Sequence, residues 1–506
     1  MIPIQPVTVL HFFISQRETR ESLRLRRPDG RLGWLVGLLV AITAISLPAA
    51  SGAQTPAQTA RADSLFSELT ESTPGAAAVV VREGVVVFRA GYGMANLDHS
   101  IRITPQTVFD VASVSKQFDG FAVASLVESG AIDLDAQVRD YLPELPDFGL
   151  SLTVRHLVHH ASGIRDWPIT LAVAGWRFDD VISFDQILRM TWSQRELNFE
   201  PGSEYSYSNT GYNLLAEIVQ RVTGQTFRAW TDENIFEPLA MSSSHFQDNH
   251  LEVVPGRAYG YNPTPAGEWT VSPNGLTALG SSSLHSSVDD MARWLINYDT
   301  HVVGGSAVIE RMQTPGVLTS GDTNVYAYGL NGVEWHGART YTHTGSWAGN
   351  RTVIMHFPDI QSGVIVLANS GAYNPTPPGR GLAEIFLDDL LGPSDPEEAG
   401  AQGQSTQPPP SPAPELSSDE LEEYAGDWVS EELDTHYVLS VVDGTLVAQH
   451  YRHGTIRLTA QKPDIFVGNL FFFRPVRFER DTSGALGDMF VGEGRARNLR
   501  FVRAAR

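Results

Sequence analysis

A series of strand-like segments late in the chain limits the folds that most of this sequence can adopt. Three strand-like segments follow one another there, separated by short turn sequences rich in Gly, Pro and Asp. They span residues 340–344, 351–357 and 363–369. Consecutive strands joined by short turns are typical of an antiparallel meander, because parallel strands need long crossover connections.

A second strand pair stands near the N-terminus. Residues 76–82 and 85–90 are β-rich and flank Glu83-Gly84, a hairpin signal. The segment between them and the meander, above all residues 150–300, has mostly helical patterning with long polar loops. We therefore expect the hairpin to complete the meander's sheet around a mainly helical middle. A closing helix over residues 381–391 should pack on that sheet.

The C-terminal part has a different pattern. Residues 393–414 are Pro-rich and predict a linker, and residues 415–506 then contain short, turn-punctuated strand segments. The strand segments are residues 437–441, 445–450, 455–460, 465–473, 476–481, 488–491 and 496–502. This pattern predicts a small all-β barrel or sandwich. The fold class is therefore α+β, an antiparallel sheet flanked by helices with a helical subdomain, followed by an all-β domain.

The N-terminus has the layout of a secretory signal. Four arginines between residues 24 and 31 precede an apolar run over residues 32–47, and small residues suited to cleavage follow up to Ala53. We expect residues 1–53 to be a signal peptide, residues 54–61 a flexible start and residues 62–392 the main domain. The mature protein would be periplasmic or extracellular, and an uncleaved signal would make the segment a membrane anchor.

Composition excludes several classes of function. The 506 residues carry a net charge of −22, which argues against nucleic acid or an anionic membrane surface as a partner. The chain has no cysteine, so disulfides, thiolate metal sites and a cysteine nucleophile are excluded.

The stretch Ser113-Val-Ser-Lys116 places a hydroxyl and an amine three residues apart at the start of a predicted helix. Residues i and i+3 share a helix face, so both side chains should point to one place. Only two of the 36 basic residues are lysines, Lys116 and Lys462. Because a desolvated Lys can lose its proton and Arg cannot, an amine at this position suits a proton acceptor.

Two further stretches fit a nucleophilic serine. Tyr207 and Asn209 lie in a predicted loop before a helix over residues 212–222, and a phenol beside a cation can have a lowered pKa and act as base and acid. Asn209 can hold Lys116 or a substrate carbonyl. His343-Thr344-Gly345-Ser346 ends a predicted strand, where a glycine permits close substrate approach.

These three motifs, in this order, resemble those of the serine β-lactamase and penicillin-recognising superfamily, over about residues 62–395. The match is to the branch of class C β-lactamases, DD-peptidases, D-aminopeptidases and related esterases. No G-x-S-x-G elbow and no H-E-x-x-H helix competes with it. The resemblance implies a β-lactamase/transpeptidase-like fold, no cofactor and no metal.

The resemblance also implies roles for the matching residues. Ser113 would be acylated, Lys116 would deprotonate it, and Tyr207 would be the shared base and acid. Asn209 would orient the substrate. His343, Thr344 and Gly345 would stand in the third motif, and the Ser346 N–H would pair with that of Ser113 as an oxyanion hole.

One residue departs from the pattern of most β-lactamases, which have Lys where this chain has His343. An imidazole is only partly charged near neutral pH and is a weaker anchor for a β-lactam carboxylate. The resemblance therefore favours an exported serine hydrolase acting on D-amino-acid peptides, which include cell-wall peptides, or on short esters. Two alternatives stay open: a β-lactam-hydrolysing enzyme, and an inactive cell-wall-binding or scaffold protein.

Other candidate residues carry weaker signals. His156 and His160 have the i, i+4 spacing of a metal pair, with His159 between them, but no acidic ligand stands at matching spacing, so we expect packing or hydrogen bonding. Trp347 directly follows the third motif and is the one tryptophan we expect to contact substrate.

Overall fold

The structure, a computed structural model, describes residues 54–393 and 416–504. The predicted signal segment and nearly all of the predicted linker lie outside these residues. The largest sheet has six strands, all paired antiparallel, in the order β14-β15-β16-β17-β1-β2. They are β14 (Asn331–Trp335), β15 (Ala338–Trp347), β16 (Asn350–Phe357), β17 (Ser362–Ala368), β1 (Ala76–Arg82) and β2 (Val85–Tyr92). The N-terminal hairpin completes the meander as predicted; β14 was not predicted.

The strand β1, which lies between β17 and the edge strand β2, is buried on both faces, which explains its unbroken apolar sequence Ala-Ala-Ala-Val-Val-Val. Ala77, Val79 and Val81 belong to the core on the side of the helical middle. Ala76, Ala78 and Val80 belong to a second core on the opposite face. Residues alternate across a strand, so one strand contributes to both cores.

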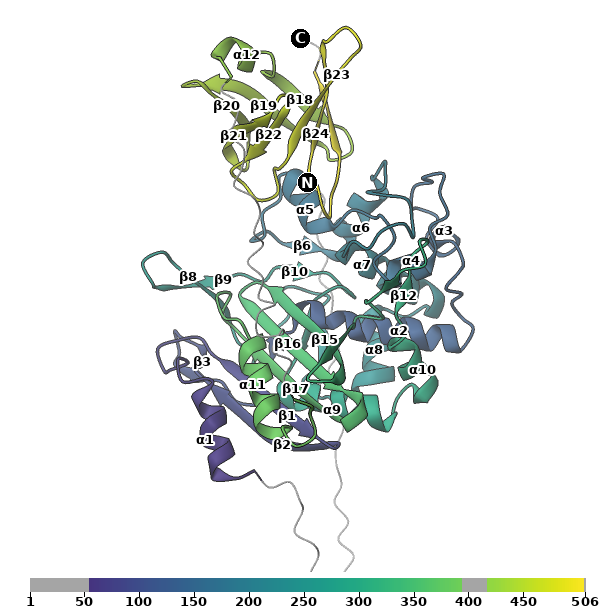
Figure 1. Cartoon of the computed structure of the whole chain (residues 1–506), viewed down its shortest axis with the longest axis vertical. Helices are drawn as coiled ribbons and strands as arrows, with labels where there is room; N and C mark the ends of the chain where they lie inside the picture. The colour runs from purple at the N-terminus through teal and green to yellow at the C-terminus, as the bar shows by residue number, and fades with distance from the viewer. Residues whose placement is uncertain (1–53, 394–415, 505–506) are drawn as a thin grey trace, which may run out of the picture. The chain divides into compact units, whose positions relative to one another are not determined.

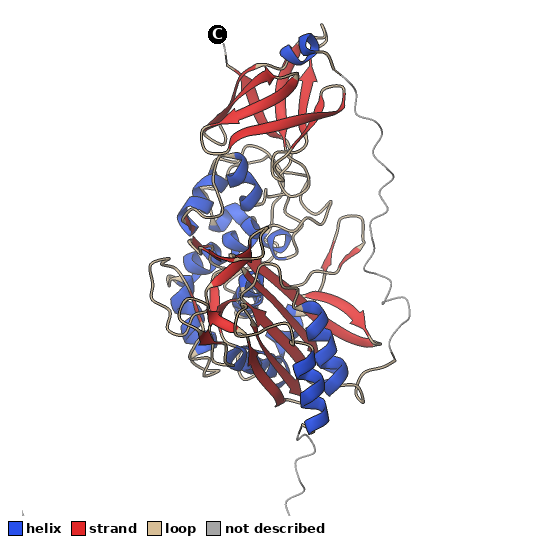
Figure 2. Ribbon diagram, turned by 90° about the vertical axis from the view of Figure 1, so that its left-hand side faces the viewer, coloured by secondary structure: helices blue, strands red, loops and turns tan. Residues whose placement is uncertain are grey.

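Two helices cover the second face of the sheet, α11 (Thr376–Phe386) and α1 (Pro56–Ser64), which lie side by side in Figure 2. The predicted closing helix over residues 381–391 therefore starts and ends five residues earlier. Its start coincides with prolines in the first turn, where the missing N–H costs no hydrogen bond. The predicted flexible start over residues 54–61 is wrong: Thr55 and Gln58 form a capping box that begins α1.

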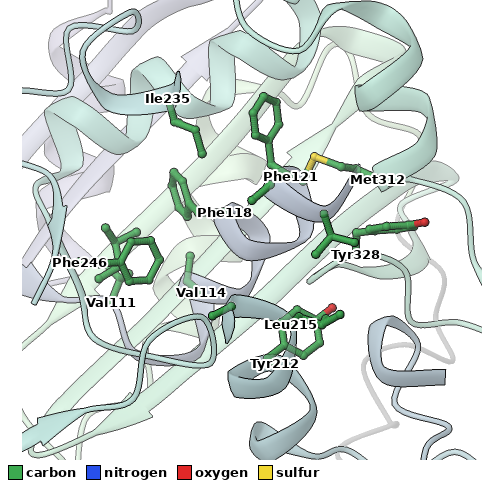
Figure 3. Packing of buried hydrophobic residues seen from close by; sticks show 14 of the residues in the cluster. Val111, Val114, Phe118, Phe121, Tyr212, Leu215, Ile235, Phe246, Met312 and Tyr328 are labelled. Atoms are coloured by element: carbon green, nitrogen blue, oxygen red, sulfur yellow. The ribbon is translucent and has the colours of Figure 1, made fainter. Parts of the chain in front are cut away.

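The other core contains α2 (Lys116–Glu128), which follows a 3-10 turn, η1 (Ala112–Ser115). The predicted helix from residue 113 thus begins three residues later, and Ser113 lies in the turn. Figure 3 shows Phe118 and Phe121 of α2 packing into this core. Trp294 stacks on Phe118 with ring centroids 4.4 Å apart. Burial of such large side chains holds α2 firmly beneath the sheet.

The remaining helices build the helical middle. They are α3 (Val138–Tyr141), α4 (Val154–Val158), α5 (Trp167–Val173), α6 (Phe184–Trp192), α7 (Asn209–Thr223), α8 (Phe227–Thr231), the π-helical turn η2 (Asp232–Phe236), α9 (Val288–Thr300) and α10 (Gly305–Met312); the 3-10 turn η3 (Pro358–Ile360) joins β16 to β17. The predicted helix over residues 212–222 is confirmed and stops at Gly224, which has φ +72°.

Short strands join these helices. They are β3 (Met94–Asn96), β4 (Ile101–Arg102), β5 (Phe109–Asp110), β6 (Ile182–Ser183), β7 (His245–Phe246), β8 (Gly260–Pro263), β9 (Trp269–Ser272), β10 (Leu276–Thr277), β11 (Leu284–Ser286), β12 (Gly316–Val317) and β13 (Thr323–Asn324). The strand β5 pairs with β11 directly before the turn that carries Ser113. No helix in the part of the chain that the structure describes is long and apolar enough to span a membrane.

The C-terminal domain is a closed barrel of eight strands, β18 to β25 (Figure 1). The strands are β18 (Gly426–Ser430), β19 (Thr435–Val442), β20 (Thr445–His450), β21 (Gly454–Lys462), β22 (Ile465–Gly468), β23 (Val476–Arg480), β24 (Leu486–Val491) and β25 (Leu499–Arg503), preceded by α12 (Ser418–Glu422). Sequence patterning missed β18, which pairs with β25 and closes the barrel. Its Trp428 is fully buried in the barrel core.

The barrel packs on α5 of the catalytic part of the chain. Ala172 and Val173 of α5 belong to the barrel's hydrophobic core. The Tyr437 hydroxyl donates a hydrogen bond of 2.9 Å to the Val173 carbonyl, and the buried Arg165 forms an ion pair with Glu432 of the barrel. The apolar contact and the buried pair fix barrel loops beside the residues that precede α5.

Candidate active site

Ser113 stands on a strained turn between β5 and α2. The preceding residue, Ala112, has φ +49°, a conformation that a non-glycine residue adopts only where its surroundings enforce it. Asp110 enforces it by accepting a 2.7 Å hydrogen bond from the Ala112 N–H, while Asn274 donates to the other carboxylate oxygen, also at 2.7 Å. Burial raises the pKa of Asp110 to about 6 against these two hydrogen bonds. Ser113 is thereby presented to the cleft.

The Lys116 amine is fully buried one turn further on. It donates to the Asn209 Oδ1 atom at 2.8 Å and to the Ser281 carbonyl at 2.7 Å. Burial lowers the pKa of Lys116 to about 7, opposed by the negative charge of Asp166. A large fraction of the amine is therefore neutral near physiological pH, as a proton acceptor requires.

Tyr207 connects Ser113 with the cations of the site. The Lys116 Nζ atom lies 4.8 Å from the centroid of its ring. We predicted that a neighbouring cation would lower the pKa of this phenol, and that prediction is wrong. Burial raises its pKa, and its interaction with the Ser113 side chain opposes this only in part. Tyr207 is thus a neutral phenol in the same cleft as the candidate nucleophile.

The side-chain amide of Asn209 is hydrogen-bonded to other residues of the protein. Its backbone N–H and its Nδ2 atom donate to Asp166 Oδ1 at 2.7 and 3.0 Å, and its Oδ1 atom accepts from Lys116. Of the two partners predicted for this amide, a substrate carbonyl and Lys116, the structure places it on Lys116. Asp166, which is buried, orients the amide and lies in the field of the Lys116 charge.

His343 is held as a neutral ring. Its Nδ1 atom is 2.7 Å from the Thr344 carbonyl and its Nε2 atom is 2.9 Å from the Tyr326 hydroxyl. Burial, together with the nearby charge of Lys116, lowers the pKa of His343 to about 3. Because Nδ1 must carry the proton to donate to a carbonyl, Nε2 accepts from Tyr326. We infer that the third motif contributes no positive charge here.

Gly345 has a packing role beside the substrate approach predicted from the sequence. A Cβ atom at this position would lie 2.4 Å from the Val111 carbonyl oxygen and 2.2 Å from Thr352 Oγ1. The glycine therefore permits β15 to approach the backbone that leads to Ser113. Thr352 Oγ1 donates to the same Val111 carbonyl at 3.0 Å. This close approach brings Ser346 beside the nucleophile turn.

Gly345→Ala should accordingly destabilise the protein by about 1–3 kcal/mol, since overpacking of this size forces the backbone to move. It should also displace the Ser113 turn and reduce labelling of that serine. Gly332→Ala on β14 is the matched control, because its Cβ would meet no atom closer than 3.5 Å. Thermal unfolding of both variants measures the effect, and equal melting temperatures would contradict this assignment.

The candidate residues border one cleft of about 880 Å³. Ser113, Tyr207, Asn209, His343, Thr344 and Ser346 all line it. Lys116 lies behind them against Asn209, and Gly345 is a residue of β15 that does not line the cleft. Pairing between β15 and β14 ends at Thr342, so the edge of residues 343–347 has no strand partner among the described residues. An extended substrate can bind along such an edge.

Aromatic side chains form one wall of the cleft. Trp347 lines it as predicted, and its ring centroid lies 5.6 Å from that of Phe178. Phe178 in turn packs at 5.8 Å against Phe471, which comes from the barrel and is half exposed. Trp167 also borders the cleft but is almost fully buried, and Trp192 packs against the main core. The wall offers flat apolar faces to a substrate side chain.

The histidines at 156, 159 and 160 take part in hydrogen bonds. His159 Nδ1 lies 2.9 Å from the Tyr326 carbonyl, and His160 Nδ1 accepts from the Ser208 N–H. Across residues 54–393 and 416–504, no group of three or more His, Asp or Glu side chains is placed to hold a metal ion.

Sequence reasoning missed three residues of the site, Asp166, Tyr326 and Arg495. Asp166 directly precedes α5 and belongs to none of the three motifs. Arg495 belongs to the barrel, far along the chain, yet it lines the cleft and lies with its guanidinium carbon 4.7 Å from the Tyr207 ring centroid. No local pattern marks a residue whose role depends on the packing of two domains.

Comparison with known proteins agrees with this geometry. A D-aminopeptidase of Gluconobacter oxydans (strain 621H) is 28% identical over 296 residues, which are 58% of this chain and 56% of that protein. One from Brucella canis is also 28% identical, over 301 residues, with the same coverage. The chain thus spans little more than half the length of these curated relatives.

Solved structures share the fold. The octameric penicillin-binding protein homologue from Pyrococcus abyssi has a TM-score of 0.59 at 22% identity, covering 88% of this chain and 99% of its own. The D-amino acid amidase from Ochrobactrum anthropi SV3 has a TM-score of 0.56 at 19% identity, covering 66% and 99%. Residues 62–386 match the family described as Beta-lactamase, over more than half of the chain. With its three motifs gathered around one cleft, this chain belongs to the beta-lactamase family.

Proposed function

We propose that the protein is a serine hydrolase that forms an acyl-enzyme on Ser113 and cleaves amide or ester bonds. One observation carries the proposal: Ser113 and the half-buried Tyr207 line one cleft, and the Tyr207 ring centroid lies 4.8 Å from the amine of Lys116, whose pKa is about 7. A scaffold that uses the fold without chemistry has no need of a desolvated, partly neutral amine, because burying it is costly.

The reaction follows from this arrangement. Ser113 Oγ attacks the substrate carbonyl. Its proton passes by way of the Tyr207 hydroxyl to the neutral amine of Lys116. The backbone N–H groups of Ser113 and Ser346 stabilise the oxyanion. The proton then passes to the leaving nitrogen or oxygen, and the C–N or C–O bond breaks. Water attacks the ester and releases the acid, and Ser113 regains its proton.

The substrate class we favour is amides and peptides whose acyl group is a D-amino-acid residue, with short esters as the second class. Two comparisons support it, the curated relatives named D-aminopeptidase and a structural neighbour named D-amino acid amidase. The aromatic wall of Phe178, Trp347 and Phe471 suits a large apolar side chain on the acyl group. Efficient β-lactam hydrolysis is the less favoured activity, since the neutral His343 offers no charge to a β-lactam carboxylate. Export remains part of the proposal on the strength of residues 24–53.

Intact-protein mass spectrometry tests the proposal. Wild type and Ser113→Ala are each incubated with a fluorophosphonate and, separately, with penicillin. We expect a stoichiometric fluorophosphonate adduct on the wild type only, and at most a slow penicillin adduct. An adduct that persists in Ser113→Ala would assign the nucleophile elsewhere, and no adduct from either reagent would favour the inactive scaffold.

A further inference from the structure

The barrel contributes a charged residue to the cleft. Arg495 lies on the loop between β24 and β25, and its backbone carbonyl accepts hydrogen bonds of 2.9 Å from the Asp166 N–H and from Asn198 Nδ2. Asp166 is the residue that orients Asn209 and, through it, Lys116. The loop is therefore joined directly to the backbone of the candidate active site.

The loop is held from several sides. The buried Arg165 donates to the Arg497 carbonyl at 3.0 Å and to the Asn498 carbonyl at 3.3 Å. The Arg497 N–H donates to Asn198 Oδ1 at 2.8 Å, and its guanidinium pairs with Glu204 at 2.8 Å. A loop with this many anchors holds its side chains in place before a substrate arrives, which lowers the entropic cost of binding.

The Arg495 side chain lines the cleft and keeps N–H groups free to donate hydrogen bonds. Its guanidinium covers one part of the Tyr207 ring, and its Nη1 atom lies 3.7 Å from Asp166 Oδ2. The side chain is still 53% exposed. Within the described residues Asp166 is its one ionic partner, and that carboxylate already accepts from the backbone and side-chain nitrogens of Asn209. Most of the five guanidinium N–H groups are thus available to a ligand.

The charges that line the cleft favour an anion. They are Asp166, Asp179, Arg351 and Arg495. Asp166 accepts hydrogen bonds from Asn209 and interacts with the charge of Lys116. Asp179 forms an ion pair of 2.7 Å with Arg177. Arg351 has no carboxylate partner among the residues that the structure describes, and donates only to the Asn350 carbonyl at 2.8 Å. Both charges left to meet a substrate are therefore positive, and the neutral His343 adds none.

We propose that Arg495 binds a free carboxylate of the substrate, so that this enzyme hydrolyses carboxylate-bearing amides or esters in preference to substrates with a free amine. This inference rests on the proposed serine hydrolase function. The guanidinium fork matches the two oxygens of a carboxylate and would receive it beside Tyr207. In this arrangement the barrel, and not the third motif, supplies the positive charge that binds the substrate carboxylate.

The test uses the full chain and substrates that differ only in charge. On the acyl side, N-succinyl-D-phenylalanine p-nitroanilide is compared with the N-acetyl compound and with the free amine. On the leaving-group side, N-acetyl-D-phenylalanyl-glycine is compared with its glycinamide. We expect the carboxylate member of at least one pair to have a kcat/KM at least tenfold above its neutral partner, and the free amine to be the poorest substrate.

The variants locate the preference. Arg495→Glu should abolish or reverse it, and Arg495→Lys should keep part of it, because the charge remains while the fork is lost. Arg457→Glu is the control, since Arg457 is an exposed barrel arginine that does not line the cleft. A wild type without a carboxylate preference, or an unchanged preference in Arg495→Glu, would overturn the inference.

Fluorophosphonate labelling of Ser113 separates the two proposals. No labelling of wild type would refute the hydrolase itself, whereas labelling without charge preference would refute only the role of Arg495. Where turnover is slow, the same compounds are compared as protectants against labelling, which needs no catalysis. If Arg495→Glu proves unfolded by its thermal transition, Arg495→Gln takes its place and should likewise lose the preference.

Discussion

Replacing Lys116 with Arg should lower the rate of Ser113 acylation by about 10³-fold, within the range that a positioned general base contributes. The substitution keeps the positive charge beside Asn209 and Asp166, but a guanidinium cannot give up its proton in a protein. The wild-type amine can, because burial lowers its pKa to about 7. Loss of acylation with retained charge would identify the amine as a proton acceptor and not merely a cation.

Single-turnover labelling with the fluorophosphonate measures the effect directly. In the wild type, the labelling rate should rise with pH through about 7, because the neutral amine is the active form; Lys116→Arg should lack this rise. The chain provides its own control in Lys462→Arg, an exposed lysine on the barrel. Lys116→Met, which keeps the length of the side chain, guards against a rate loss that reflects only the larger guanidinium. Near-normal labelling in Lys116→Arg would refute the role.

The sheet could be predicted from sequence because its rules are local. Alternation and short turns identified three successive strands and the N-terminal hairpin, and each pairs as expected. The strand β14 escaped detection because it is only five residues long, begins with Asn331-Gly332 and is mostly half-buried or exposed. The closing helix begins earlier than predicted because Pro377 and Pro378 lie in its first turn, where prolines are tolerated.

In the candidate site, too, the local features could be predicted from the sequence and those that depend on packing could not. Ser113, Lys116, Tyr207 and Asn209 could be found from short motifs, because each motif is a run of a few consecutive residues. The charge state of the site could not, since it depends on burial that only the packed structure provides. Burial makes Tyr207 a weaker acid and His343 a neutral ring, the first against our prediction and the second beyond it. Asp166 and Arg495 meet only because the barrel packs on α5.

Tyr207→Phe should lower kcat by about 10²-fold or more, with a smaller change in KM. The substitution removes the hydroxyl that interacts with Ser113 and leaves the ring that contacts both the Lys116 amine and the Arg495 guanidinium. The cavity and the two cation contacts therefore persist, so a rate loss reports on proton transfer and not on folding. Because the phenol is a stronger donor to a leaving group than water in this buried site, amides should suffer more than esters with good leaving groups.

Comparison of an amide with an activated ester of the same acyl group checks this expectation, with Tyr205→Phe as the matched control. Tyr205 is two residues away, is 42% exposed and does not line the cleft. Its loss should leave both rates near wild type. Equal losses for amide and ester in Tyr207→Phe would place the hydroxyl in activation of Ser113 alone, because only proton donation to the leaving group distinguishes the two substrates. Unchanged rates for both would remove Tyr207 from the chemistry and leave Lys116 to act on Ser113 without it.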